Sequence, residues 1–161
     1  MDEILEILAN DARGTPEEIA KLTGKTASAV KQAISKYEKD GTIVKYKTVI
    51  NNEQGKESDS QVRALIEVSM EPQKDVGFDH IAERIYSFPE VTSCYLVSGA
   101  YDLLVVVEGT NLQTVSNFIA SKLAPMPHIR STTTHFLLKK YKEDGHVFIK
   151  KAGDKRLSIS Y

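Results

Sequence analysis

Apolar residues recur every three to four positions in the first 40 residues, which predicts three short helices. The first covers about residues 4–12. The second begins at Pro16, because proline suits the first helical position, and runs to about residue 22. Thr15 can cap this helix, and Glu18 stands where a capping box needs it. Gly24 follows in a turn, where glycine adopts a positive φ without steric cost.

A third helix is expected over residues 27–39, with Thr26 as its cap and Asp40-Gly41 at its end. Its two sides differ in character. One side is apolar and comprises Ala27, Val30, Ala33, Ile34 and Tyr37; the other is polar and comprises Ser28, Lys31, Gln32, Ser35 and Lys39. A β-rich stretch follows over residues 43–50, in which Lys45, Tyr46 and Lys47 can form a small wing.

The second half of the chain changes pattern, with strand-like runs separated by two amphipathic helices. The expected order is strand, helix, strand, strand, helix, strand, over residues 62–70, 76–88, 91–98, 101–108, 112–124 and 129–138. This is the order of a ferredoxin-like split βαβ unit. A further hairpin is expected in the tail, around residues 152–154.

The strand at residues 103–107 is apolar on both of its faces. In a four-stranded sheet with two helices, both helices lie on one face. The strand residues that point to the other face are polar if that face meets water. The second face must therefore be covered. A homodimer is the simplest cover, and a first domain folded back over the sheet is the alternative.

Charge is distributed unevenly, although the net charge is only −1. Residues 1–20 carry six acidic residues and one basic residue, whereas residues 21–50 carry seven lysines and two acidic residues. Residues 51–138 are acidic, with eleven acids against six bases, and residues 139–161 are basic, with seven bases against three acids. These blocks predict a basic face on the first domain and an acidic second domain.

The composition excludes several classes of protein. With 41% hydrophobic and 27% charged residues, the chain is an ordinary globular mixture rather than a disordered tail or a fibre. No apolar run approaches 18 residues and no secretory signal is visible, so we expect a cytoplasmic protein with no membrane partner. Cys94 is the only cysteine, which excludes a disulfide framework. We expect no cofactor and no metal, because the four histidines lack ligand spacing.

Residues 16–35 match the helix-turn-helix pattern, which needs a small residue at the helix crossing, a glycine in the turn and an aliphatic residue in the second helix. Ala20, Gly24 and Val30 supply them. Lysines can bind phosphates or guanine edges, and glutamine can bind adenine. The alternative is a three-helix core with an incidental polar face. The predicted DNA-binding residues are Lys25, Thr26, Ser28, Lys31, Gln32, Ser35, Lys36, Lys39, Lys45 and Lys47.

Several segments in a fixed order carry a family resemblance: residues 4–12, 19–20 and 24, then 40–44, 98–104 and 132–134. On these segments, the chain resembles the Lrp/AsnC family of feast/famine transcription regulators over about residues 2–142. The resemblance implies a DNA-binding domain, a linker and a ferredoxin-like domain. The latter assembles dimers into tetramers or octamers and binds a small effector, often an amino acid, between dimers.

The resemblance also points to an effector site in a hairpin and the facing last strand, comprising Ser98, Gly99, Ala100, Tyr101, Asp102, Thr132 and Thr134. Asp102 can accept hydrogen bonds from an ammonium group, while backbone N–H groups near Gly99 and the threonine hydroxyls can bind a carboxylate. The alternative is that Asp102 caps the hairpin and the threonines suit a strand.

The recognition helix departs from the family pattern. Family recognition helices often carry paired arginines, whereas the helix over residues 27–39 carries Lys31, Gln32 and Lys36 instead. We therefore expect DNA recognition to rest mainly on phosphates and shape.

These observations predict an α+β protein with an N-terminal winged helix-turn-helix domain and a C-terminal ferredoxin-like βαββαβ domain. The expected boundaries are 1–50 for the first domain, 51–61 for a linker, 62–142 for the second domain and 143–161 for a tail. We expect a non-enzymatic transcription regulator that binds double-stranded DNA and an amino-acid effector. One alternative is a tetrapyrrole enzyme similar to the sirohaem decarboxylases, for which His80 and His128 are the only counterparts; another is a sensor that does not bind DNA.

Overall fold

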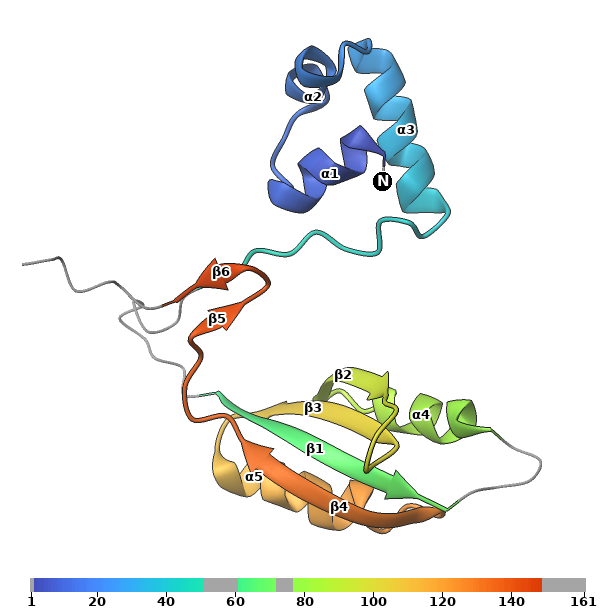
Figure 1. Ribbon diagram of the computed structural model, residues 1–161, viewed down its shortest axis with the longest axis vertical. Helices are drawn as coiled ribbons and strands as arrows, with labels where there is room; N and C mark the ends of the chain where they lie inside the picture. The colour runs from blue at the N-terminus through green and yellow to red at the C-terminus, as the bar shows by residue number, and fades with distance from the viewer. Residues whose placement is uncertain (1, 51–60, 72–76, 149–161) are drawn as a thin grey trace, which may run out of the picture. The chain divides into compact units, whose positions relative to one another are not determined.

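The computed structural model describes residues 2–50, 61–71 and 77–148. The chain divides into two compact units, residues 1–50 and residues 51–161, called unit 1 and unit 2 below. Both are shown in Figure 1. Among the described residues, no helix has the length and apolar character needed to cross a membrane.

Unit 1 consists of three helices: α1 Glu3–Asn10, α2 Pro16–Thr23 and α3 Ala27–Lys39. The predicted capping box at α2 is confirmed, because the Glu18 amide donates to Thr15 Oγ1 at 3.3 Å and the Thr15 amide donates to Glu18 Oε2 at 2.9 Å. Gly24 ends α2 with φ +69°, and the Ala29 amide donates to Thr26 Oγ1 at the start of α3. Caps therefore fix where α2 and α3 begin.

A small apolar core holds the three helices together. It contains Ile4, Leu8, Ile19, Ala20 and Val30, of which Ile19 and Val30 are fully buried. The apolar side predicted for α3 is confirmed, since Ala27, Ala33, Ile34 and Tyr37 pack against this core. The opposite side of α3 is consequently turned outward.

Residues 43–50 form no strand, so the β-rich stretch and the wing expected there are not seen as strands in the described part of the chain. A strand needs a neighbour for its N–H and C=O groups. Unit 1 offers these residues little contact: Val44 is 90% and Ile50 67% exposed. The segment is attached to α3 by the Ile43 amide, which donates to the Tyr37 carbonyl, and by the Tyr46 hydroxyl, which donates to Glu38.

Unit 2 contains the predicted βαββαβ order. Its elements are β1 Val62–Met70, α4 Phe78–Tyr86, β2 Val91–Leu96, β3 Leu103–Gly109, α5 Leu112–Phe118 and β4 Ile129–Phe136. The strands form one antiparallel sheet in the order β2-β3-β1-β4. This confirms the ferredoxin-like arrangement, in which both helices cover one face of the sheet (Figure 1).

The covered face of the sheet is fully apolar at its centre. Ile66, Val68, Val105 and Val107 have no exposed surface and pack with side chains of α4 and α5 such as Ile85. At the end of β3 the packing is close: a Cβ on Gly109 would lie 2.9 Å from Val115 Cγ2. Glycine is therefore required where α5 approaches the sheet.

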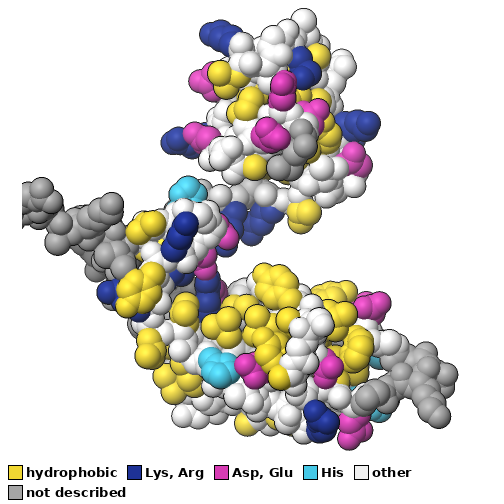
Figure 2. All heavy atoms as spheres, in the orientation of Figure 1, with side chains coloured by type: hydrophobic (Ala, Val, Ile, Leu, Met, Phe, Trp, Pro, Cys, Tyr) yellow, Lys and Arg dark blue, Asp and Glu magenta, His cyan; other side chains and the backbone are white. Residues whose placement is uncertain are grey.

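No helix among the described residues covers the other face of the sheet, which is called the open face. Strand pairing places Leu65 opposite Val106, and Leu104 opposite Tyr95, on this face. Leu65, Val106 and Leu104 are half-buried, and Tyr95 is 55% exposed. Figure 2 shows hydrophobic side chains gathered over β2 and β3 in unit 2. The predicted apolar character of both faces of β3 is thus confirmed.

The second helix of unit 2 ends differently from the single helix expected over residues 112–124. After Phe118 the chain forms a π-helical turn, Ile119–Leu123, closed by a hydrogen bond from the Ala124 amide to the Ile119 carbonyl. Lys122 lies in this turn, 2.5 Å from Glu90 Oε1 and 5.5 Å from the centre of the Phe88 ring. These contacts stabilise a turn that sequence periodicity does not show.

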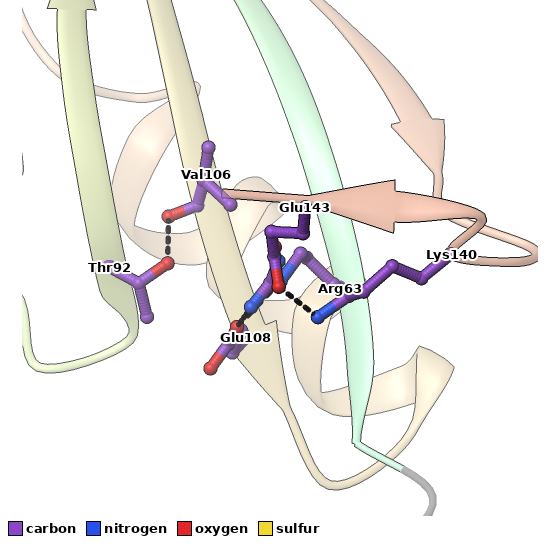
Figure 3. A network of polar contacts seen from close by, with 6 residues as sticks. All are labelled: Arg63, Thr92, Val106, Glu108, Lys140 and Glu143. Carbon is purple, nitrogen blue, oxygen red and sulfur yellow. Dashed lines mark hydrogen bonds and ion pairs between the residues drawn. The ribbon is translucent and has the colours of Figure 1, made fainter. Parts of the chain in front are cut away.

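A two-stranded hairpin follows the sheet: β5 Lys142–Glu143 and β6 His146–Val147, joined at Asp144 and Gly145. It precedes the hairpin expected around residues 152–154, which lies outside the described residues. Arg63 of β1 holds it, because its guanidinium bridges Glu108 of β3 and Glu143 of β5 (Figure 3). Glu143 also pairs with Lys140.

Candidate nucleic-acid interface and ligand site

The outward side of α3 carries most of the predicted DNA-binding residues. Lys31, Gln32, Lys36 and Lys39 are exposed, as is Ser28, and Ser35 is half-buried. Gln32, Ser35, Lys36 and Lys39 line an open hollow together with Asp40 at the end of the helix. The structure therefore brings the core of the predicted set onto one surface.

The charges on this surface are available to a ligand. Within the part of the chain that the structure describes, no carboxylate forms an ion pair with Lys31, Lys36 or Lys39. Asp40 is held by the side chain and amide of Thr42, and these hydrogen bonds lower the pKa of its carboxyl. The positive field of α3 is thus directed to solvent, where it can attract phosphates.

The remaining members of the predicted set are arranged differently. Lys25 lies 3.6 Å from Glu3 Oε2, so an ion pair with α1 offsets part of its charge. The Thr26 hydroxyl is occupied as a cap acceptor. Lys45 and Lys47 are exposed on the segment that follows α3, beside the contact between Tyr46 and Glu38. These four residues surround the α3 surface rather than form it.

The carboxylate of Asp102 anchors the hairpin between β2 and β3 to the end of β1. Its Oδ2 accepts from the Met70 amide at 2.6 Å, and its own amide donates to the Val68 carbonyl at 3.0 Å. The Val97 amide donates to the Asp102 carbonyl, which closes the hairpin. The sequence alone did not indicate the contact between Asp102 and Met70, because these two residues lie 32 positions apart.

The rest of the predicted effector residues fall into two groups. Ser98, Gly99 and Ala100 form the exposed turn of the hairpin, with Tyr101 half-buried beside them. Thr132 and Thr134 lie on β4, opposite Val68 and Ile66 of β1. Because β1 runs between β3 and β4, the last strand does not face the hairpin as expected but lies two strands away.

The open face also carries polar residues that sequence reasoning missed. His135 Nε2 lies 3.2 Å from Glu67 Oε1, across the β1–β4 pair. The alternation along β1 contained the signal, because Arg63, Leu65 and Glu67 share one face of a strand whose other face is buried. The open face therefore has an apolar centre and charged residues on β1 around it.

Comparison with known proteins identifies both units. Residues 3–44 match the winged helix-turn-helix DNA-binding domain, and residues 63–147 match the Lrp/AsnC ligand binding domain. The chain belongs to the Lrp/AsnC family. It is 46% identical over 160 residues, 98% of this chain and 95% of the other, to YugG of Bacillus subtilis, an uncharacterized HTH-type transcriptional regulator.

Solved structures of this fold include Escherichia coli AsnC, with a TM-score of 0.68, 23% identity and coverage of 88% of this chain and 91% of that one. A Neisseria meningitidis transcriptional regulator in complex with L-methionine gives a TM-score of 0.69, 24% identity and coverage of 88% and 89%. As a member of the Lrp/AsnC family, the chain is a transcription regulator with a DNA-binding domain and a ligand-binding domain. The tetrapyrrole enzyme alternative is therefore wrong.

Proposed function

We propose that the outward side of α3 binds operator DNA and that an amino-acid effector changes the assembly of unit 2 and thereby the affinity for DNA. The observation that carries the first part is a set of lysines on a helix capped at its start by Thr26; Lys31, Lys36 and Lys39 form no ion pair with any carboxylate of the described residues. Lysine supplies point charges rather than a bidentate fork, so phosphate contacts supply most of the affinity. Such a regulator acts in the cytoplasm, where the chromosome is.

The open face supports assembly of two chains. Its apolar centre, Leu65, Leu104 and Val106, is only half-buried, and an apolar sheet face is stabilised by removal from water. We assign its cover to the open face of a second copy. A dimer presents two α3 helices to successive major grooves, about 34 Å apart along the DNA.

The variants Lys31→Ala and Lys36→Ala test the DNA surface. We expect each to weaken binding to a duplex recovered by selection from genomic fragments, and to reduce the slope of log affinity against log salt by about 0.9 per lost phosphate contact. The control is Arg84→Ala, which removes an exposed cation from α4 of unit 2. Wild-type salt dependence in both α3 variants would show that α3 is not the recognition helix.

The proposed effector is a free amino acid, as in the L-methionine complex of the Neisseria relative. Its ammonium and carboxylate groups are joined through a single carbon, whereas Asp102 and Thr132 of one chain are separated by β1. We therefore propose that Asp102 of one copy and the Thr132 and Thr134 hydroxyls of a neighbouring copy contribute to the site. Ligand binding then depends on assembly, and assembly on ligand.

The substitution Asp102→Asn separates the charge of this carboxylate from its structural role. Asparagine retains an oxygen that can accept from the Met70 amide, whereas Asp102→Ala removes it. We expect thermal-shift screening against the twenty amino acids to find a ligand that raises the melting temperature of the wild type. Asp102→Asn is expected to melt like the wild type without ligand and to lose the shift. A full shift in this variant would remove Asp102 from the site.

A further inference from the structure

The segment that follows α3, residues 43–50, carries charge without forming a helix or a strand (Figure 1). It contains Lys45 and Lys47 and no acidic residue. Both lysines are exposed, and among the described residues neither forms an ion pair. A cation on a loose segment loses conformational entropy when it binds a phosphate. The attachment of the segment therefore decides how much these lysines can contribute to binding.

Two hydrogen bonds attach this segment to α3. The Ile43 amide donates to the Tyr37 carbonyl at 2.9 Å, and the Tyr46 hydroxyl donates to Glu38 Oε1 at 3.1 Å. The second is the only side-chain hydrogen bond that the segment makes within the described part of the chain. Partial removal of the ring from water, and then the contact with Glu38, raise the pKa of Tyr46 above its ordinary value. The hydroxyl therefore stays protonated at neutral pH and can donate.

Glu38 lies at the edge of the outward side of α3. It follows Lys31 by about two helical turns, so the two side chains lie in one row along the helix. The hydrogen bond from Tyr46 therefore holds the chain between Lys45 and Lys47 beside that row. The two lysines thus flank a fixed point at the edge of the surface that α3 is proposed to present to DNA.

We propose that Tyr46 is a positioning residue for DNA binding. Through Glu38 it fixes the segment so that Lys45 and Lys47 bind phosphates next to those bound by α3. The inference rests on the proposed function, because α3 brings the DNA to this surface. The hydroxyl itself does not contact DNA; the hydrogen bond restricts the segment before DNA arrives, so less entropy is lost when the lysines bind. Such phosphate contacts fix the position of a protein on the duplex without reading its sequence.

The hydrogen bond is tested by a double-mutant cycle on the full-length protein, with the duplex recovered by selection from genomic fragments. Glu38→Gln and Glu38→Ala remove the same charge, but only glutamine retains an oxygen that can accept from the Tyr46 hydroxyl. We expect Glu38→Gln to bind DNA about two- to tenfold more tightly than Glu38→Ala. Adding Tyr46→Phe to both variants should abolish this difference, because the donor is then absent.

The lysines are tested by the salt dependence of binding. Lys45→Gln with Lys47→Gln should reduce the slope of log affinity against log salt by about two. The same two substitutions should weaken binding less in the Tyr46→Phe background, where the segment is no longer held. The matched control is Tyr86→Phe, which removes an exposed phenol hydroxyl from α4 of unit 2 and should bind DNA as the wild type does. If Tyr46→Phe melts early without DNA, the difference between the two Glu38 variants still decides the question.

Two results would overturn the inference. In the first, Glu38→Gln and Glu38→Ala bind DNA equally while substitution of Lys45 and Lys47 reduces the salt slope; the two lysines then bind DNA without that hydrogen bond. In the second, substitution of the two lysines leaves the slope unchanged while Lys31→Ala and Lys36→Ala reduce it, and α3 then binds DNA alone. Unchanged slopes in the α3 variants would instead contradict the proposed function.

Discussion

Units 1 and 2 stabilise their functional surfaces in different ways. Among the described residues, the core of unit 1 has five buried side chains and that of unit 2 has thirteen. Unit 1 presents lysines on a helix whose start is fixed by a cap, whereas unit 2 presents an apolar open face above a large core. The comparison shows that the proposed DNA-binding surface rests on a small core and one cap, whereas the proposed assembly surface lies on a sheet with a larger core.

Equal truncations in the two cores should produce the largest effect. Ile19→Ala in unit 1 and Ile66→Ala in unit 2 each remove a fully buried side chain, at a cost of about 2–5 kcal/mol. We expect Ile19→Ala to unfold unit 1 at a temperature where unit 2 remains folded, because its core is small. Residue-resolved hydrogen exchange measures each unit separately.

Leu22→Ala is the control, since Leu22 lies on the same helix as Ile19 but is 72% exposed. It should leave the protection of unit 1 near that of the wild type. If Ile66→Ala lowered the exchange protection of unit 2 as completely as Ile19→Ala lowers that of unit 1, the larger core of unit 2 would not make it the more stable unit.

A charge on the open face should have the next largest effect. Leu104→Asp places a carboxylate on the open face, opposite Glu67 of β1 and beside Val106, where a second copy is proposed to pack, and an unpaired buried charge opposes association. We expect sedimentation to show monomers that retain the wild-type circular dichroism. Asn117→Asp adds a charge to exposed α5 on the opposite layer and should leave the assembly intact. Unchanged mass in Leu104→Asp would assign the dimer contact elsewhere.

Loss of the α3 cap should have a smaller effect, confined to unit 1. Thr26→Ala removes the acceptor of the Ala29 amide, which costs about 1 kcal/mol. Thr26→Ser keeps the hydroxyl oxygen and should restore most of the stability of unit 1, measured by chemical denaturation. Equal losses in the two variants would mean that the threonine methyl group, rather than the cap, matters at this position.

The hairpin of β5 and β6 should show the smallest effect, and one that depends on pH. The Lys140 ammonium, and then the Arg63 guanidinium, hold the pKa of Glu143 below its ordinary value. A carboxyl with a lowered pKa in the folded state stabilises the fold above its unfolded pKa of about 4.3, and this stabilisation is lost as the pH falls through the folded value. The Phe148 amide donates to the Tyr141 carbonyl beside the hairpin. Its protection factor, which corrects for the intrinsic pH dependence of exchange, should therefore fall below about pH 4 but not at neutral pH.

Glu143→Gln should produce the low protection factor of the Phe148 amide already at neutral pH. Asp144→Asn is its matched control, because it removes a carboxylate from the adjacent turn without touching the Arg63 network. An amide that exchanges at the wild-type rate in Glu143→Gln would show that Phe148 packing alone holds the hairpin.

The local features of the fold were predictable from sequence, because neighbouring residues determine them. Thr15, Pro16 and Glu18 locate the start of α2, and alternation over residues 62–70 gives the bounds of β1. The Asp144-Gly145 pair is a common hairpin turn, so the β5–β6 hairpin was also readable, although the tail was interpreted differently.

Features that depend on distant residues were not predictable. The π-helical turn is stabilised by Lys122 and Glu90, which are 32 residues apart, and Arg63 meets Glu143 across 80 residues. For the candidate site, the polar side of α3 follows from helical periodicity alone. The anchoring of Asp102 by Met70, and the separation of β4 from the hairpin, follow from strand order, which a single strand's sequence does not contain.

The position of β1 has a mechanical consequence. The segment that joins the two units enters unit 2 at β1, and β1 is hydrogen-bonded on both sides, to β3 and to β4. Tension along that segment would load both ladders in shear at once. An edge strand would instead be peeled away one bond at a time. A pull on β1 therefore meets more resistance than the same pull on an edge strand of this sheet would.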